Sequence, residues 1–201
     1  GIGCVKDKAE AFKWYKKAAE QNIANAQNMV GRYLEEGWGG VTKSNEEAIE
    51  WYRLAAEQGY AVAQNNLGIF LENGIGCTKN QVEAVEWYRK AAEQGNAGAQ
   101  YALAKCLENG RGCDVDKEEA LKWYRKAADQ GDQDAKKVLE RINSKNKFFE
   151  LRNKAEEGNV AVQYELAEHL YYGKDCSQNY REAVKWYKKA AEQGHVKAQY
   201  N

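Results

Sequence analysis

Residues 61–96 read AVAQNNLGIFLENGIGCTKNQVEAVEWYRKAAEQGN, and this stretch decides the fold. Apolar side chains recur at helical spacing in 61–73 and again in 82–94, which predicts a helix over each segment. Between them, 74–80 is rich in residues that tolerate a positive φ or bond their own backbone, so it is predicted to be a loop. Gly95 stands where a helix-ending glycine belongs.

The second helix carries a Trp-Tyr pair that recurs along the chain, at Trp14-Tyr15, Trp51-Tyr52, Trp87-Tyr88, Trp123-Tyr124 and Trp186-Tyr187. The first four pairs are 37, 36 and 36 residues apart, and the last gap of 63 fits one shortened copy followed by a full one. One helix pair cannot bury its apolar face alone, whereas stacked copies can. A tight helix crossing is implied at one repeat position, which is held by the small residues Gly31, Gly68, Ala104 and Ala167. The sequence therefore predicts an all-α solenoid of about five to six helix pairs.

The pattern resembles the Sel-1-like repeat family, a relative of the tetratricopeptide repeat. Ala61-Val62-Ala63-Gln64, Leu67-Gly68, Gly74-Ile75-Gly76 and residues 84–95 match the family consensus position by position. The resemblance implies a right-handed α/α superhelix of antiparallel helix pairs. It also implies a role as an adaptor in signalling, protein quality control or host–microbe contact, without one shared ligand.

The repeat pattern divides the chain into a single solenoid over residues 1–201. We expect a half repeat at 1–23, full repeats at 24–60, 61–96 and 97–132, a shortened degenerate repeat at 133–159, a full repeat at 160–195 and the start of another at 196–201. Because both ends cut through a repeat, we expect the chain to be a fragment of a longer protein.

The degenerate copy lacks the Gly-x-Gly loop, and residues 133–157 contain neither glycine nor proline. Either Asn143-Ser144-Lys145-Asn146 makes a tight turn, or the two helices fuse into one long rod. Four residues of weak helix propensity and good turn chemistry fall together there, which favours the turn. Either arrangement predicts a kink or discontinuity of the superhelix near 133–158.

Charge and composition narrow the function classes. Lysine plus arginine equals aspartate plus glutamate, at 30 each, so the chain has no electrostatic reason to bind nucleic acid or an anionic membrane. No run of 18 apolar residues exists, so no direct membrane insertion is expected. The absence of C-x-x-C, together with the single cysteine in most repeats, favours a reducing, intracellular and cytoplasmic location.

The reactive residue types fall at packing positions of the repeat. One repeat position is shared by Cys4, Cys77, Cys113 and Cys176, and another by Tyr33, Phe70, Cys106 and His169. The first is predicted to be a packing position because the family usually has an apolar residue there, and the second because aromatic residues share it. Some secreted relatives carry two cysteines per repeat and bridge their helix pairs, whereas most repeats of this chain carry one. His195 is predicted to be exposed. The Gly-x-Gly loops lack phosphate-loop spacing. We expect no catalytic residue, no metal site and no cofactor.

A ligand is expected on the first helix of each pair, which lines the concave side in related solenoids. By resemblance, the groove residues are Asn28, Arg32, Asn65, Asn66, Ile69, Tyr101, Lys105, Tyr164, Glu168 and Tyr172. Their identity varies between copies, unlike the packing positions. Asparagine can both give and accept hydrogen bonds along an extended backbone, and tyrosine combines contact area with a polar tip. The hypothesis is a protein or peptide ligand.

The sequence thus favours a non-catalytic interaction scaffold or adaptor. One alternative is a structural spacer or a self-associating solenoid, whose exposed end faces stack end to end. A hydrolase is a third, less favoured alternative, and would need Cys106 or His169 in a nucleophile–base pair.

Overall fold

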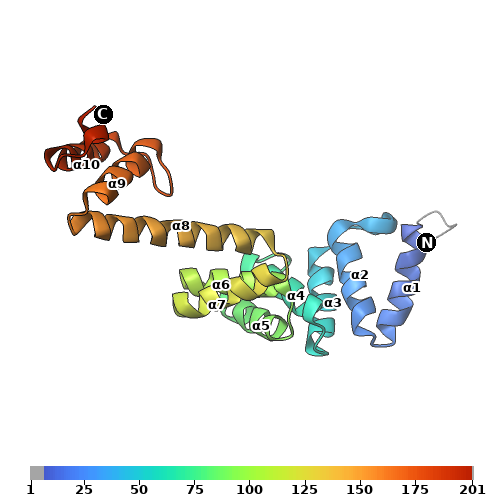
Figure 1. Cartoon of the computed structure of the whole chain (residues 1–201). Coiled ribbons are helices and arrows are strands. Elements are labelled where there is room, and N and C mark those ends of the chain that lie inside the picture. Colours follow the sequence, from blue (N-terminus) through green and yellow to red (C-terminus); the bar gives the residue numbers. More distant parts are fainter. Residues whose placement is uncertain (1–6, 201) are drawn as a thin grey trace. The chain divides into compact units, whose positions relative to one another are not determined.

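A computed structural model of the protein describes residues 7–200 (Figure 1). Within this range there are ten α-helices, two short 3₁₀ helices and no strand. The prediction of an all-α solenoid is therefore confirmed. In chain order the elements are α1 (Lys8–Glu20), α2 (Ala24–Glu36), η1 (Trp38–Gly40), α3 (Asn45–Glu57), α4 (Ala61–Asn73), α5 (Gln81–Glu93), α6 (Ala97–Asn109), α7 (Lys117–Asp129), α8 (Gln133–Glu156), α9 (Val160–Tyr172), α10 (Tyr180–Glu192) and η2 (Val196–Gln199).

Helix ends follow the capping signals of each repeat. The second helix of a pair begins with a side-chain acceptor that binds the backbone N–H three residues later, at Ser44, Asn80, Asp116 and Asn179. A glutamate occupies that third position in each case, which is the capping-box pattern. The first helix ends at a glycine in the left-handed region, as at Gly74 with φ +70°.

The chain forms two compact units, residues 1–136 (unit 1) and 137–201 (unit 2). In unit 1, consecutive helices from α1 to α7 pack on one another. In unit 2, α9 packs on α10, and α10 packs on η2. The boundary between the units falls inside the degenerate repeat.

The core of each repeat is built from the tyrosine of the Trp-Tyr pair and from small residues. Tyr52, Tyr88 and Tyr124 are at most 1% exposed, and lie deeper than the tryptophans beside them. A Cβ at Gly68 would lie 2.6 Å from Cε1 of Tyr88. The predicted tight crossing at this position is therefore real, because the ring of the second helix lies directly on the backbone of the first.

The predicted tight turn at Asn143-Ser144-Lys145-Asn146 is wrong. Residues 133–156 form one continuous helix, α8, of 24 residues (Figure 1). Residues of modest helix propensity each cost less than about 0.7 kcal/mol, which is too little to end a helix that has neither glycine nor proline. The shortened repeat has also lost the seven-residue loop that α4 and α5 use to reverse direction, 74–80.

Candidate binding surface

The first helices of unit 1 carry a row of side chains at one matching repeat position. Arg32 of α2 and Ile69 of α4 are exposed, whereas Lys105 of α6 is half-buried. The Nζ of Lys105 lies 5.4 Å from the centre of the Tyr101 ring, within the range of a cation–π contact. On the first helices of three successive repeats, two cationic side chains therefore flank one apolar side chain.

Three asparagines lie beside this row. Asn28 is only 3% exposed, and its Oδ1 accepts a hydrogen bond of 3.0 Å from Nδ2 of Asn66. Asn28 thus orients Asn66 from below and has almost no surface of its own. Among the described residues, the buried Oδ1 of Asn65 has no hydrogen-bond partner. A buried acceptor left without a donor costs about 1–3 kcal/mol.

A line of carboxylates borders the same surface, each held by a buried tyrosine of the second helix. The hydroxyl donors and their acceptors are Tyr52 to Glu35 at 2.5 Å, Tyr88 to Glu72 at 2.9 Å, and Tyr124 to Glu108 at 2.7 Å. Burial and the adjacent carboxylate raise the pKa of Tyr52 and Tyr88 above the ordinary value. The hydroxyls of Tyr52 and Tyr88 therefore stay protonated and fix Glu35 and Glu72 in place.

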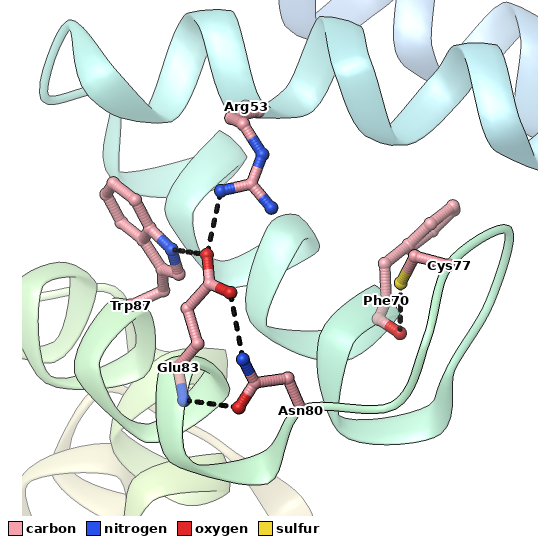
Figure 2. A network of polar contacts seen from close by, with 6 residues as sticks. All are labelled: Arg53, Phe70, Cys77, Asn80, Glu83 and Trp87. Atoms are coloured by element: carbon pink, nitrogen blue, oxygen red, sulfur yellow. Dashed lines mark hydrogen bonds and ion pairs between the residues drawn. The ribbon is translucent and has the colours of Figure 1, made fainter.

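Successive repeats are joined by a second set of ion pairs on the second helices, shown in Figure 2. Arg53 of α3 donates to Oε1 of Glu83 in α5 at 2.7 Å, and Nε1 of Trp87 donates to the same oxygen at 3.2 Å. Asn80 caps α5 and also donates to Glu83. The arrangement recurs with Arg89 and Glu119 at 2.6 Å, so it is a property of the repeat and not of one binding site.

The Gly-x-Gly loops also join neighbouring repeats. A Cβ at Gly76 would lie 2.4 Å from the backbone carbon of Asn45, at the start of α3. A Cβ at Gly112 would lie 2.1 Å from the backbone oxygen of Gln81, at the start of α5. Each loop therefore rests against the beginning of the second helix of the preceding repeat.

In unit 2, α9 presents the remaining predicted ligand residues. Tyr164 donates to Glu168 at 3.0 Å, and Tyr172 is 70% exposed. The prediction that His195 is exposed is wrong. Its half-buried ring stacks on Tyr164 at 4.4 Å with an interplanar angle of 20°.

A family model of the Sel1 repeat matches residues 1–23, 24–60, 61–96, 97–132 and 160–195. The chain belongs to the Sel1 repeat family. A comparison with curated proteins found no match.

Three solved structures resemble this chain, two of them over nearly its whole length. The protective antigen c5321 of uropathogenic Escherichia coli, which displays an SLR fold, is 32% identical with a TM-score of 0.69, over 99% of this chain and 44% of that one. A Sel1 repeat protein of Oxalobacter formigenes is 34% identical with a TM-score of 0.62, over 96% and 86%. The cysteine-rich protein B of Helicobacter pylori is 25% identical with a TM-score of 0.52, over 69% and 99%. The chain thus spans less than half the length of the Escherichia coli protein.

The cysteines of these Sel1 repeats lie in unreactive surroundings. All four described cysteines are free, and Cys106 is buried. Burial raises the pKa of the Cys106 thiol to about 12 and that of Cys77, Cys113 and Cys176 above the ordinary value. A nucleophilic cysteine needs a lowered pKa, so these thiols act as packing groups. Cys4 lies outside the described residues.

His169 occupies the packing position that the Sel1 repeat pattern assigns to it. It is 5% exposed, and its Nδ1 lies 3.1 Å from the backbone oxygen of Lys174. A carbonyl only accepts, so Nδ1 carries the hydrogen. Over residues 7–200, no three His, Cys, Asp or Glu side chains gather closely enough to hold a metal ion. Within the same range, no helix has the length and apolarity needed to cross a membrane.

Two surface residues escaped the sequence prediction. They are Tyr171 and Tyr180. The ring centre of Tyr171 lies 5.0 Å from that of Tyr172 and 5.1 Å from that of Tyr180. A signal was present in the Sel1 repeat pattern, because Tyr171 replaces the glutamate found at Glu35, Glu72 and Glu108.

Proposed function

We propose that this Sel1 repeat chain is a non-catalytic scaffold, and that the faces of its first helices bind an extended segment of a partner protein. In unit 1 the binding residues are Asn65, Asn66, Ile69, Tyr101 and Lys105, with Arg32 at the edge and Asn28 in support. In unit 2 they are Tyr164, Glu168 and Tyr172. The four free thiols favour a reducing, intracellular compartment.

The observation that carries the proposal is the row of Arg32, Ile69 and Lys105, in which an exposed apolar side chain lies between two cations. An extended peptide presents backbone N–H and C=O groups at regular intervals, and the half-buried amide of Asn66, which Asn28 orients, is placed to pair with them. Ile69 beside it is 37% exposed and offers apolar contact. The alanines of the second helices and the tyrosine of the Trp-Tyr pair recur between copies whereas these positions vary, and such variation is typical of recognition.

The two residues that the hydrolase alternative requires, Cys106 and His169, lie in surroundings that favour binding over catalysis. The thiol of Cys106 is held protonated by burial, and His169 Nδ1 is held by a backbone oxygen. We therefore infer that any activity of this surface is recognition.

The experiment selects peptides from a random display library on the intact chain, then compares two charge-matched triple variants. The surface variant is Asn65→Asp, Ile69→Glu, Lys105→Glu on first helices. The control is Leu54→Glu, Val82→Glu, Lys122→Glu on second helices, at exposed positions.

The expected result is at least about a tenfold loss of peptide affinity in the surface variant, equal to about 1.4 kcal/mol, and little change in the control. Peptides retained equally by both variants would place the site elsewhere. A mass in light scattering that grows with concentration, with no peptide selected, would instead support the self-associating alternative.

A further inference from the structure

Unit 2 carries a cluster of exposed tyrosines where α9 ends and α10 begins. Tyr171, Tyr172 and Tyr180 are 42%, 70% and 53% exposed. Tyr171 meets Tyr172 with ring centres 5.0 Å apart at 82°, and Tyr180 at 5.1 Å and 72°. These contacts fix the three rings relative to one another and leave much of their surface to solvent. We call them the tyrosine cluster.

The repeat itself does not require this cluster. The three matching positions are polar in every other full repeat, with Glu35, Glu36 and Asn45, then Glu72, Asn73 and Gln81, then Glu108, Asn109 and Lys117. The same backbone therefore folds with polar residues at all three positions. Three tyrosines in contact at the surface of one repeat are a feature of that repeat alone, and large exposed aromatic groups mark interaction sites.

The cluster continues into an acidic hollow on one flank. A hollow of about 290 Å³ is lined by Tyr172, Glu165, Glu168, His169 and Lys174. The carboxylate of Glu165 is about half exposed, at 55%. A guanidinium in this hollow would contact the Tyr172 ring and lie near the two carboxylates, whereas Lys174 would repel it.

We propose that the tyrosine cluster binds a proline-rich segment in the polyproline II conformation, with an arginine placed in the hollow beside Tyr172. A polyproline II helix makes no internal hydrogen bonds, so its carbonyls are free to accept from tyrosine hydroxyls. Its pyrrolidine rings pack on aromatic surfaces, and its stiffness lowers the entropy lost on binding. The acidic hollow supplies the charge complement for arginine.

This inference deepens the proposed function, because it names the partner chemistry for the face that includes Tyr164, Glu168 and Tyr172. It does not depend on the unit 1 surface, whose residues are amide, apolar and basic. The two surfaces are therefore separable by variants confined to one unit.

The test measures binding of three capped peptides to the intact chain by calorimetry: arginine followed by eight prolines, glutamate followed by eight prolines, and arginine followed by four Gly-Ser units. The cluster variant is Tyr171→Glu, Tyr172→Asn, Tyr180→Gln, which installs the residues of the α4–α5 repeat. In that repeat Tyr88 donates to Glu72, and we expect Tyr187 to accommodate the new carboxylate likewise. The control variant is Tyr200→Ala, at a tyrosine that is 85% exposed.

We expect arginine-oligoproline to bind wild type and the Tyr200→Ala variant equally, and the cluster variant at least about tenfold more weakly, since each aromatic contact contributes about two- to tenfold. The unit 1 surface variant should bind it as wild type does. Glu165→Gln with Glu168→Gln should reduce the preference for arginine over glutamate.

Three results would overturn the inference. They are no binding at about 1 mM peptide, equal binding of the Gly-Ser peptide, and undiminished binding by a cluster variant with wild-type helicity. Loss of binding only in the unit 1 variant would also refute it, while supporting the wider proposal. If the display library selects no peptide that depends on the unit 1 surface, but arginine-oligoproline still binds, the unit 1 site is refuted and the present inference is supported.

Discussion

Replacing Gly112 with alanine tests whether the Gly-x-Gly loops join neighbouring repeats. Gly112 has φ +73°, and an added Cβ would lie 2.1 Å from the oxygen and 2.4 Å from the carbon of the Gln81 carbonyl. Gly40 lies in the corresponding loop two repeats earlier with φ +78° and has nothing within 4 Å of its Cβ position. The two glycines share a backbone conformation and differ in what surrounds them.

The expected magnitudes follow from this difference. A left-handed conformation costs a residue with a Cβ about 1–2 kcal/mol, and both Gly40→Ala and Gly112→Ala incur this cost. In Gly112→Ala the overlap is with backbone, so the loop must move away from the start of α5. Overpacking of this kind costs about 1–3 kcal/mol more. We therefore expect about 1–2 kcal/mol for Gly40→Ala and about 2–5 kcal/mol for Gly112→Ala.

The assay is urea denaturation followed by circular dichroism, with amide exchange in α5 as a local readout. Solenoid repeats can unfold separately, so the free energies of unfolding are compared only if each variant shows the same dependence on urea concentration as wild type. Faster exchange at the start of α5 in Gly112→Ala alone would support the docking of loop on helix. Two variants that agree within about 0.5 kcal/mol would refute it, since only the shared backbone cost would then remain.

Three further predictions concern single groups. Hydrogen bonds from Arg89 and Trp123 hold the pKa of Glu119 below its ordinary value of 4.5, so its stabilisation is complete above that pH and is lost as the pH falls. The Arg89 side chain is 39% exposed, so solvent screens this ion pair. Glu119→Gln should therefore lower the free energy of unfolding by at most about 1 kcal/mol, and this free energy should then depend less on pH in the acid range. Burial raises the pKa of Tyr88, so its contribution to stability is complete below pH 10 and is lost as the pH rises above it. Ultraviolet absorbance should show the ionisation of Tyr88 only together with loss of helicity. Ser144→Pro in the middle of α8 should cost about 3 kcal/mol or more and reduce helical ellipticity, whereas Gln133→Pro at the first position of α8 should cost less than about 1 kcal/mol; similar small effects at both sites would argue for a turn at Ser144.

The fold was predictable from the sequence wherever a residue acts within its own helix or at a fixed repeat position. Apolar spacing located the α4 and α5 helices to within one residue, and Gly68 correctly marked a close crossing. These signals are local, or recur at a fixed repeat position, so one sequence suffices to find them. The Sel1 family match rests on the same repeated positions.

Contacts between repeats were not predictable in the same way. The Arg53–Glu83 pair spans 30 residues, and its register depends on how one repeat stacks on the next. The tyrosine cluster joins the last residues of one helix to the first residue of another across a loop, so no single helical face reveals it. The burial of Asn28 likewise depends on Asn66 of the next repeat.

The α8 helix and one unusual residue in the next repeat have a common explanation. The second loop glycine is Gly39, Gly76 or Gly112 in three repeats, and each would place a Cβ within 3 Å of the start of a preceding second helix. The last repeat has Asp175 at this position, with φ +61°. The backbone conformation is kept, and because Asp175 has a Cβ it incurs a cost of up to about 1–2 kcal/mol that glycine avoids. What differs is the neighbour: because α8 runs unbroken through 143–146, the degenerate repeat has no separate second helix whose start the loop must approach. Loss of one loop thus removes the steric need for glycine in the next, and a side chain with its own polar contact, Oδ2 lying 3.7 Å from Nδ1 of His169, takes its place.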